Sequence, residues 1–160
     1  DIVHFIAAYL KYKSLKDYPL SAPSIKVKYF IKGEYEIDIY VEELSYGIEC
    51  KVFDFMWAVS RERMENWLKE FKTKIDTYVS AGVKYMLIVT NLKEDIVRTL
   101  KTGLSEYINE KGYNIKLEDV LGSDPEKLLE KLNDIARRVS EEVQQRIRKE
   151  VEAKIKVETK

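Results

Sequence analysis

The sequence predicts a three-layer α/β/α domain with a central mixed sheet, followed by a C-terminal helical extension. Three observations support this prediction. Three β-rich segments follow a short opening helix, helices and strands then alternate, and a long helical pattern ends the chain. We assign residues 1–122 to the α/β domain and residues 123–160 to the extension.

The first half of the domain is predicted to be a helix and a meander of three strands. The helix covers Ile2 to Lys13 and ends before the prolines that follow. The strands cover Ser24 to Lys32, Glu34 to Glu42 and Tyr46 to Phe53. In the second strand, alternation places two sets of residues on opposite faces: Ile37, Ile39 and Val41 on one, Glu36, Asp38 and Tyr40 on the other.

The second half is predicted to alternate helices and strands. Ser60 caps a helix that ends near Gly82, and Lys84 to Thr90 contains the apolar run of a strand buried on both faces. A helix from Glu94 to Lys111 and a short strand from Asn114 to Leu117 follow. Asn91, after the buried strand, suits either a functional site or a helix cap.

The extension begins with dense helix-start signals, namely the capping residue Ser123, Pro125 in the first turn and Glu126 for a capping box. Its apolar positions are Leu128, Leu132, Ile135, Val139, Val143, Ile147, Val151 and Ile155. From Val139 the spacing is four, which drifts around a helix. We expect an oblique crossing over the domain or a partner subunit, or a break near Ser140. A homodimer is the partner that we favour.

Composition excludes several classes of protein. One cysteine, Cys50, and one histidine, His4, exclude an internal disulfide framework and a Cys/His zinc site. No run is long enough to span a membrane, and we expect a cytoplasmic protein, in the host cytoplasm if the chain is viral. The formal charge is zero, so any nucleic-acid surface must be local. Heavy Lys and Glu use is typical of thermophiles.

The turn around Glu43 and Leu44 brings polar residues of two strands together. If these residues form the turn, Asp38 lies opposite Glu49, and Glu36 lies opposite Lys51. Two close carboxylates repel each other unless a cation lies between them. Mg²⁺ prefers one or two carboxylates together with water and phosphate oxygens, so Asp38 and Glu49 with a backbone carbonyl are suitable ligands. Lys51 would then stabilise developing charge.

Asp38 followed after eleven residues by Glu49-Cys50-Lys51 resembles the D…ExK signature of the PD-(D/E)XK nucleases, which have the restriction-endonuclease-like fold. That superfamily includes restriction enzymes, archaeal Holliday-junction resolvases and viral nucleases. The order of elements over roughly residues 1–90 is similar too. The resemblance implies Mg²⁺- or Mn²⁺-dependent cleavage of DNA, on branched or otherwise structured substrates, with Asp38, Glu49 and Lys51 as catalytic residues.

The resemblance also implies a metal ligand at the backbone carbonyl of Cys50. The family often has an acidic residue in its first helix, whereas Ile2 to Lys13 contains none, and Glu36 is a possible substitute. The missing acid favours an alternative, in which the nuclease fold has lost activity and serves as a DNA-binding or assembly module.

Each site residue also has a purely structural interpretation. Asp38, Glu49 and Lys51 would form a cross-strand ion-pair patch on a solvated sheet face. Candidate DNA-binding residues are Arg61, Arg63, Lys26 and Lys28. The arginines also suit an ordinary solvated helix face, and the lysines also suit protection of a sheet edge.

Overall fold

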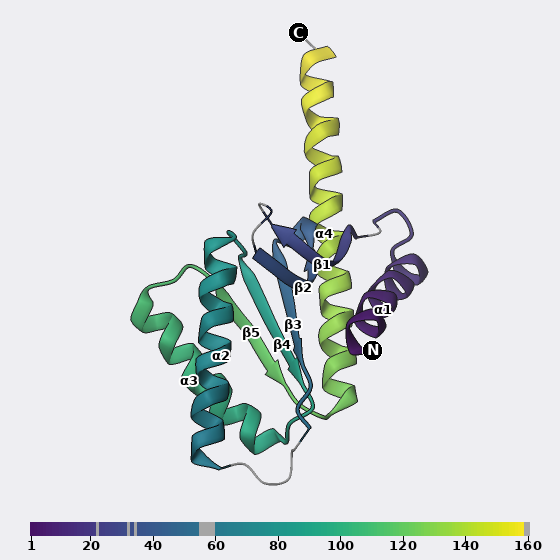
Figure 1. Ribbon diagram of the computed structural model, residues 1–160. Helices are drawn as coiled ribbons and strands as arrows, with labels where there is room; N and C mark the ends of the chain where they lie inside the picture. The colour runs from purple at the N-terminus through teal and green to yellow at the C-terminus, as the bar shows by residue number, and fades with distance from the viewer. Residues whose placement is uncertain (22, 32, 34, 55–59, 159–160) are drawn as a thin grey trace.

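The computed structural model describes residues 1–158 except residues 22, 32, 34 and 55–59. Its described part contains a five-stranded mixed sheet between two layers of helices (Figure 1). The strand order is β1 (Ile25–Ile31), β2 (Tyr35–Val41), β3 (Tyr46–Lys51), β4 (Tyr85–Thr90) and β5 (Lys116–Leu121). Neighbours from β1 to β3 are antiparallel, and those from β3 to β5 are parallel. The predicted fold class is confirmed.

The helices form the two outer layers. Helices α2 (Arg61–Ser80) and α3 (Glu94–Lys111) cover one face of the sheet, while α1 (Ile2–Asp17) and α4 (Pro125–Glu158) cover the other (Figure 1). Strand β4 lies in the middle and contributes alternate residues to both layers, as its continuous apolar run predicts.

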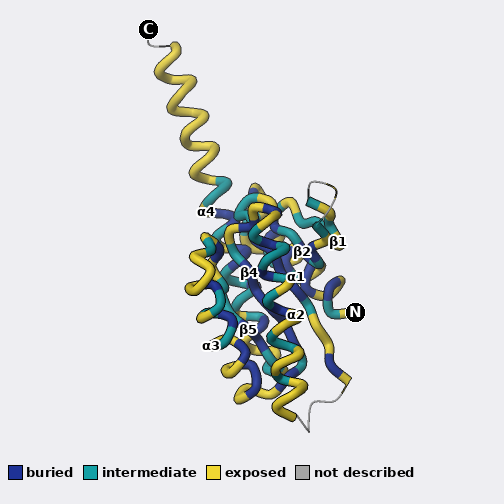
Figure 2. The backbone as a smooth tube through the Cα atoms, turned by 60° about the vertical axis from the view of Figure 1, so that its left-hand side comes forward, coloured by how far each residue is buried: buried dark blue, intermediate teal, exposed yellow. Residues whose placement is uncertain are grey.

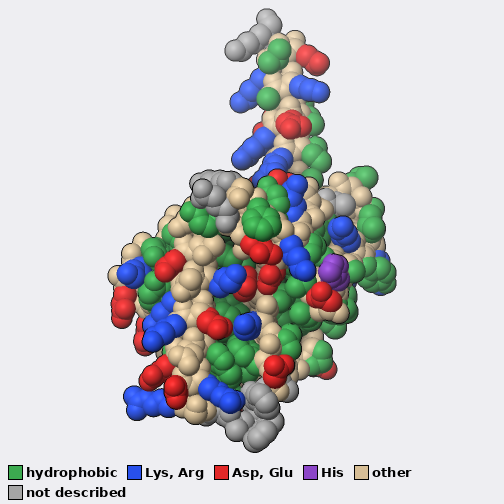
Figure 3. Space-filling model, in the orientation of Figure 1, with side chains coloured by type: hydrophobic (Ala, Val, Ile, Leu, Met, Phe, Trp, Pro, Cys, Tyr) green, Lys and Arg blue, Asp and Glu red, His purple; other side chains and the backbone are tan. Residues whose placement is uncertain are grey.

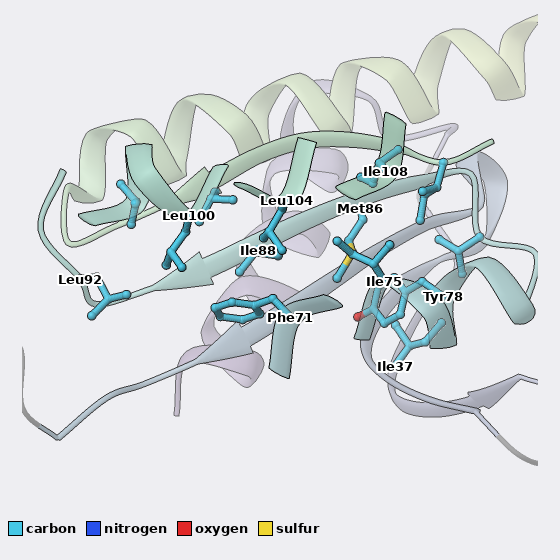
Figure 4. Close-up of a cluster of buried hydrophobic side chains, with 14 of the residues drawn as sticks. Ile37, Phe71, Ile75, Tyr78, Met86, Ile88, Leu92, Leu100, Leu104 and Ile108 are labelled. Atoms are coloured by element: carbon cyan, nitrogen blue, oxygen red, sulfur yellow. The ribbon is translucent and has the colours of Figure 1, made fainter. Parts of the chain in front are cut away.

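The core between the sheet and α2 and α3 forms because the apolar stripes of both helices face the sheet. Phe71, Ile75 and Tyr78 of α2 point toward Met86 and Ile88 of β4 (Figure 4). These side chains are almost completely buried. This apolar stripe fixes how α2 lies against β3.

Several predicted boundaries differ from the structure. Helix α1 continues four residues past Lys13, because Tyr18 caps it before Pro19 is reached. Strand β5 begins at Lys116 and continues to Leu121, so the predicted strand was placed too early. Lys32 and Glu34, which bound predicted strands, lie outside the described residues.

Helix α4 is continuous from Pro125 to Glu158, so the break considered near Ser140 is absent. Asp124 caps it instead of Ser123, since its side chain accepts a hydrogen bond from the Glu126 N–H. The first half of α4 is buried against α1 and the sheet, whereas the second half projects into solvent (Figure 2). The extension therefore contributes to the core of residues 1–122 through its first half.

Candidate functional site

The β2–β3 hairpin has the predicted register. A short 3₁₀ turn (Glu42–Leu44) joins the strands, and Ile39, Tyr40 and Val41 pair with Ile48, Gly47 and Tyr46. Asp38 and Glu49 come immediately after the Ile39–Ile48 pair, which is the last pair between these strands in the described residues. The two carboxylates therefore lie where β2 and β3 separate.

The backbone of Asp38 does not extend the pairing between β2 and β3. Its Oδ2 instead accepts a hydrogen bond from the Cys50 N–H at 2.9 Å, and the side chain is half-buried. The carboxylate thus takes the place of a backbone acceptor of β2, and the hydrogen bond fixes it beside the strand that carries Glu49.

The sheet is also irregular on the other side of Asp38. Pairing between β1 and β2 includes Val27–Ile39 and Tyr29–Ile37, and the intervening Lys28 has a φ of 49°. A non-glycine residue in this left-handed region marks a local break in a strand. On either side of this break, Ile37 packs with α2, whereas Ile39 packs with α1 and α4. The prediction that both isoleucines share one face is wrong, because it assumed unbroken alternation.

Glu49 is the buried acid of the site, with 7% of the residue exposed. Its Oε2 accepts a hydrogen bond from the Tyr78 hydroxyl at 2.7 Å, and its Oε1 lies 3.5 Å from Lys74 Nζ. Burial, followed by repulsion from Asp38, raises the pKa of Glu49 to about 7, against the opposing effects of Tyr78 and Lys74. The carboxyl therefore exchanges a proton near neutral pH.

Gly47 explains why the Tyr78 ring can approach β3. A Cβ atom at this position would lie 2.6 Å from Tyr78 Cε2, closer than atoms can pack. Gly47 and Glu49 are two residues apart and share the sheet face that α2 covers. The missing side chain at Gly47 thus leaves room for the ring whose hydroxyl holds Glu49.

Lys51 lies on the same face, two residues beyond Glu49. Its Nζ is 3.7 Å from Glu70 Oε2 and 5.9 Å from the centre of the Phe53 ring. Glu70 and Lys74 are one turn apart on α2, so Glu49 and Lys51 meet neighbouring turns of one helix. The Lys51 side chain is about half exposed and remains accessible to a ligand.

Cys50 faces the opposite layer, because successive residues of a strand point to opposite faces. Its side chain packs with the α1–α4 core, and burial raises the pKa of its thiol to about 12. Because the N–H and C=O of a strand residue point to the same edge, its carbonyl faces the Asp38 side of β3. In a continued strand Val52 would share this apolar layer, but it is 61% exposed, since β3 has ended at Lys51.

Other predicted residues lie away from the two acids. Glu36 is exposed and pairs with Phe30 in β1, so the predicted pairing with Lys51 does not form. The cause is the separation of β2 from β3 beyond the Ile39–Ile48 pair, which leaves the first half of β2 paired only with β1 in the described residues.

The predicted DNA-binding residues occupy two separate places. Lys26 and Lys28 lie on the edge strand β1, where Lys26 Nζ is 5.2 Å from the centre of the Tyr29 ring. Arg61 is exposed and forms an ion pair with Glu65 at 3.4 Å. Arg63 lines a hollow near Lys51. Acidic and basic side chains alternate over the visible face between α2 and the β1–β2 hairpin (Figure 3).

Two contributing residues escaped the sequence analysis. Tyr78 and Lys74 hold Glu49, but Tyr78 belongs to an apolar stripe and Lys74 to a charged helix face, so neither pattern indicates a site. Asn91 forms two 2.9 Å hydrogen bonds with the backbone of Phe53. It therefore does not cap α3, whose N-cap position is Lys93.

The donor set fits a divalent ion that also binds water and substrate. Asp38 and Glu49 supply two carboxylates, and the Cys50 carbonyl faces the same edge. The described residues contain no group of three His, Cys, Asp or Glu side chains that could hold a metal. Two carboxylates suffice for Mg²⁺, because water and phosphate oxygens complete its coordination. They would not suffice for an ion that is bound by side chains alone.

Comparisons of the chain with models of protein families, with curated proteins and with solved structures found no match. The resemblance to the PD-(D/E)XK nucleases therefore rests on the motif and the order of elements. Among the described helices, none is both long enough and apolar enough to cross a membrane.

Proposed function

We propose that this chain is a metal-dependent nuclease that hydrolyses DNA phosphodiester bonds, with Mg²⁺ or Mn²⁺ held by Asp38, Glu49 and the Cys50 carbonyl. One observation supports this most strongly. The Asp38 carboxylate is bonded to the N–H of the residue after Glu49, and the Glu49 carboxyl is buried with a pKa raised to about 7. Two acids so arranged repel each other and favour a cation.

The metal would supply Lewis acidity and neutralise charge on the phosphate. Asp38 is oriented by the Cys50 N–H, and Glu49 is oriented by Tyr78. Glu49 must lose its proton before it can bind a cation, and its pKa allows this near neutral pH. Lys51 would orient the attacking water or stabilise negative charge that develops on the phosphate.

Lys74 is compatible with metal binding by Glu49, because its side chain is 43% exposed and can move away from Glu49 when a divalent ion binds. The same ion pair favours a second candidate function, an inactive nuclease fold that binds DNA or assembles with a partner. In that case Lys74 would be the permanent counterion of Glu49. The lack of an acid in α1 other than Asp17, which pairs with Lys13 at 2.5 Å, also favours this candidate.

We further propose that the protein forms a homodimer through the projecting half of α4. Ile147, Val151 and Ile155 are about half exposed there and recur at intervals of four residues along the helix. Leaving such residues in water forfeits several kcal/mol at roughly 0.8 kcal/mol per methylene group. Two-fold pairing would also supply two sites for two DNA strands. The single cysteine is consistent with a reducing cytoplasm.

Cleavage assays test the proposed activity. The wild-type chain is incubated with duplex, nicked and branched DNA in Mg²⁺, in Mn²⁺ and in EDTA, beside Asp38→Asn and Glu49→Gln. Glu106→Gln is the matched control, since it neutralises an exposed carboxylate on α3. We expect cleavage only with metal, and only by wild type and control. Metal-independent cleavage, or cleavage by Asp38→Asn at the wild-type rate, would refute the proposal.

A further inference from the structure

A hollow lies next to Lys51, where the chain leaves β3. Its lining residues are Phe53, Asp54, Arg63, Asn66, Trp67 and Glu70, and its volume is about 320 Å³. Glu70 connects it to the candidate active site, because its Oε2 lies 3.7 Å from Lys51 Nζ. A ligand in this hollow would therefore lie beside the phosphate group that is attacked at the proposed active site.

The floor of the hollow is aromatic and rigidly held. The ring centres of Trp67 and Phe53 are 4.3 Å apart, and Phe71 packs edge-on against Phe53. Asn91 holds the backbone of Phe53 with two hydrogen bonds, one accepted from the Phe53 N–H and one donated to the Phe53 C=O. Phe53 is buried, whereas Trp67 remains partly exposed. A fixed, partly exposed indole is a stacking surface for a flat ring.

The charges of the hollow do not suit a phosphate. Asp54 and Glu70 offset the positive charge of Arg63, so the lining as a whole carries little positive charge. A carboxylate repels phosphate but accepts hydrogen bonds from an amino group, as Asp and Glu do from cytosine N4. Within the described ranges, no protein group is hydrogen-bonded to the side chain of Asp54 or Asn66. These groups are therefore available to a neutral ring with polar edges.

We propose that this hollow binds one unpaired nucleobase that carries an exocyclic amino group, stacked on Trp67 with its edge toward Asp54 and Asn66. This inference rests on the proposed nuclease function and specifies its substrate. A base in a duplex cannot enter the hollow without leaving its stack. The substrate is thus DNA with a single-stranded nucleotide next to the cleaved bond, as in a flap, an overhang or an open junction.

Binding measurements in EDTA test the hollow without requiring metal or cleavage. Fluorescence anisotropy is followed for labelled oligo(dC), oligo(dT) and a blunt duplex, with dCMP as a competitor. We expect wild type to prefer oligo(dC). Trp67→Leu should weaken oligo(dC) binding by roughly 5- to 100-fold, in line with the loss of one stacked base, and should leave duplex binding unchanged. Trp67→Phe keeps a ring and should retain most of the affinity.

Asp54→Ala should remove the preference for oligo(dC) over oligo(dT) while keeping the affinity for oligo(dT). Circular dichroism establishes that each variant is folded. If Trp67→Leu does not fold, the exposed Asp54→Ala variant tests the inference, and an unchanged preference for oligo(dC) in that variant would overturn it. Unchanged oligo(dC) binding in a folded Trp67→Leu, or equal loss on single strand and duplex, would overturn the inference. The inference would also be overturned if dCMP bound as tightly as the oligomer, because the hollow would then be a site for free nucleotides.

The two proposals fail in different ways. Wild-type binding of oligo(dC) through Trp67, together with no cleavage in Mn²⁺, would reject the nuclease and retain the base-binding hollow. If the rate of cleavage in Mn²⁺ is the same for Trp67→Leu as for wild type, and the same with and without unpaired bases in the substrate, the nuclease is retained and the base-binding hollow is rejected.

Discussion

The Cys50 N–H donates a hydrogen bond to Asp38 Oδ2 at 2.9 Å, so the residue between Glu49 and Lys51 holds the acid of the neighbouring strand. This contact joins both halves of the D…ExK motif through the backbone of β3. It also replaces one rung of the β2–β3 ladder, and the strands separate at that point.

Lys51→Ala should lower the rate of cleavage more than the affinity for DNA. Its charge acts most strongly where the transition state gains negative charge, and loss of such a group costs about 100-fold or more in rate. Its ion pair with Glu70 is exposed, so the free energy of unfolding should change by less than about 1 kcal/mol. Single-turnover rates and filter binding measure the two effects, with Lys69→Ala as control. An equal loss in rate and affinity would make Lys51 a simple phosphate contact.

Glu49→Gln should stabilise the metal-free protein at alkaline pH. Burial raises the pKa of Glu49 from 4.5 to about 7, so the folded state binds this proton more tightly than the unfolded state. Wild type therefore loses stability as pH rises from 4.5 through about 7, by about 3 kcal/mol at most. Glutamine is neutral throughout and avoids that loss.

Urea unfolding in EDTA at pH 4 and at about pH 8 measures this effect. The gain of Glu49→Gln over wild type should be present at the higher pH and absent at the lower one. Glu106→Gln, which removes an exposed carboxylate, should behave like wild type at both. A gain that is the same at both pH values would show that the pKa of Glu49 is not raised by folding.

Sedimentation equilibrium should show a dimer that depends on the projecting half of α4. Ile147→Lys combined with Val151→Lys places charges on the exposed apolar stripe and should yield a folded monomer, since neither residue belongs to the core. Lys149→Gln is the control, because it lies on the opposite side of the helix from this stripe. A monomeric wild-type chain at micromolar concentration would refute the dimer.

Local patterns were sufficient to predict the layers, the hairpin register and the face shared by Glu49 and Lys51. The turn and the two-residue period of strands determine these features, and both depend on residues near in sequence. The failures at Ile37 and Glu36 come from two irregularities of the sheet. A left-handed residue at Lys28 and a side-chain acceptor at Asp38 interrupt the alternation, and residue types alone do not reveal such breaks.

The partners of Glu49 were not predictable for a different reason. Tyr78 and Lys74 are distant in sequence, and their roles depend on the packing of α2 over Gly47. Gly47 was the available signal, because a glycine inside a strand often marks a close approach. The aromatic hollow likewise combines the end of β3 with α2 and with Asn91 after β4.

Titration of the folded protein with Mn²⁺ tests the central claim most directly, by calorimetry or by the electron paramagnetic resonance signal of the free ion. We expect one ion per chain, bound more tightly as pH rises through about 7, because Glu49 must release its proton. Asp38→Asn should weaken binding by more than about 100-fold, since loss of an outer-shell partner alone costs 10- to 100-fold. Glu106→Gln should bind like wild type. No Mn²⁺ bound to wild type, or equal binding by Asp38→Asn, would contradict a metal centre at Asp38 and Glu49.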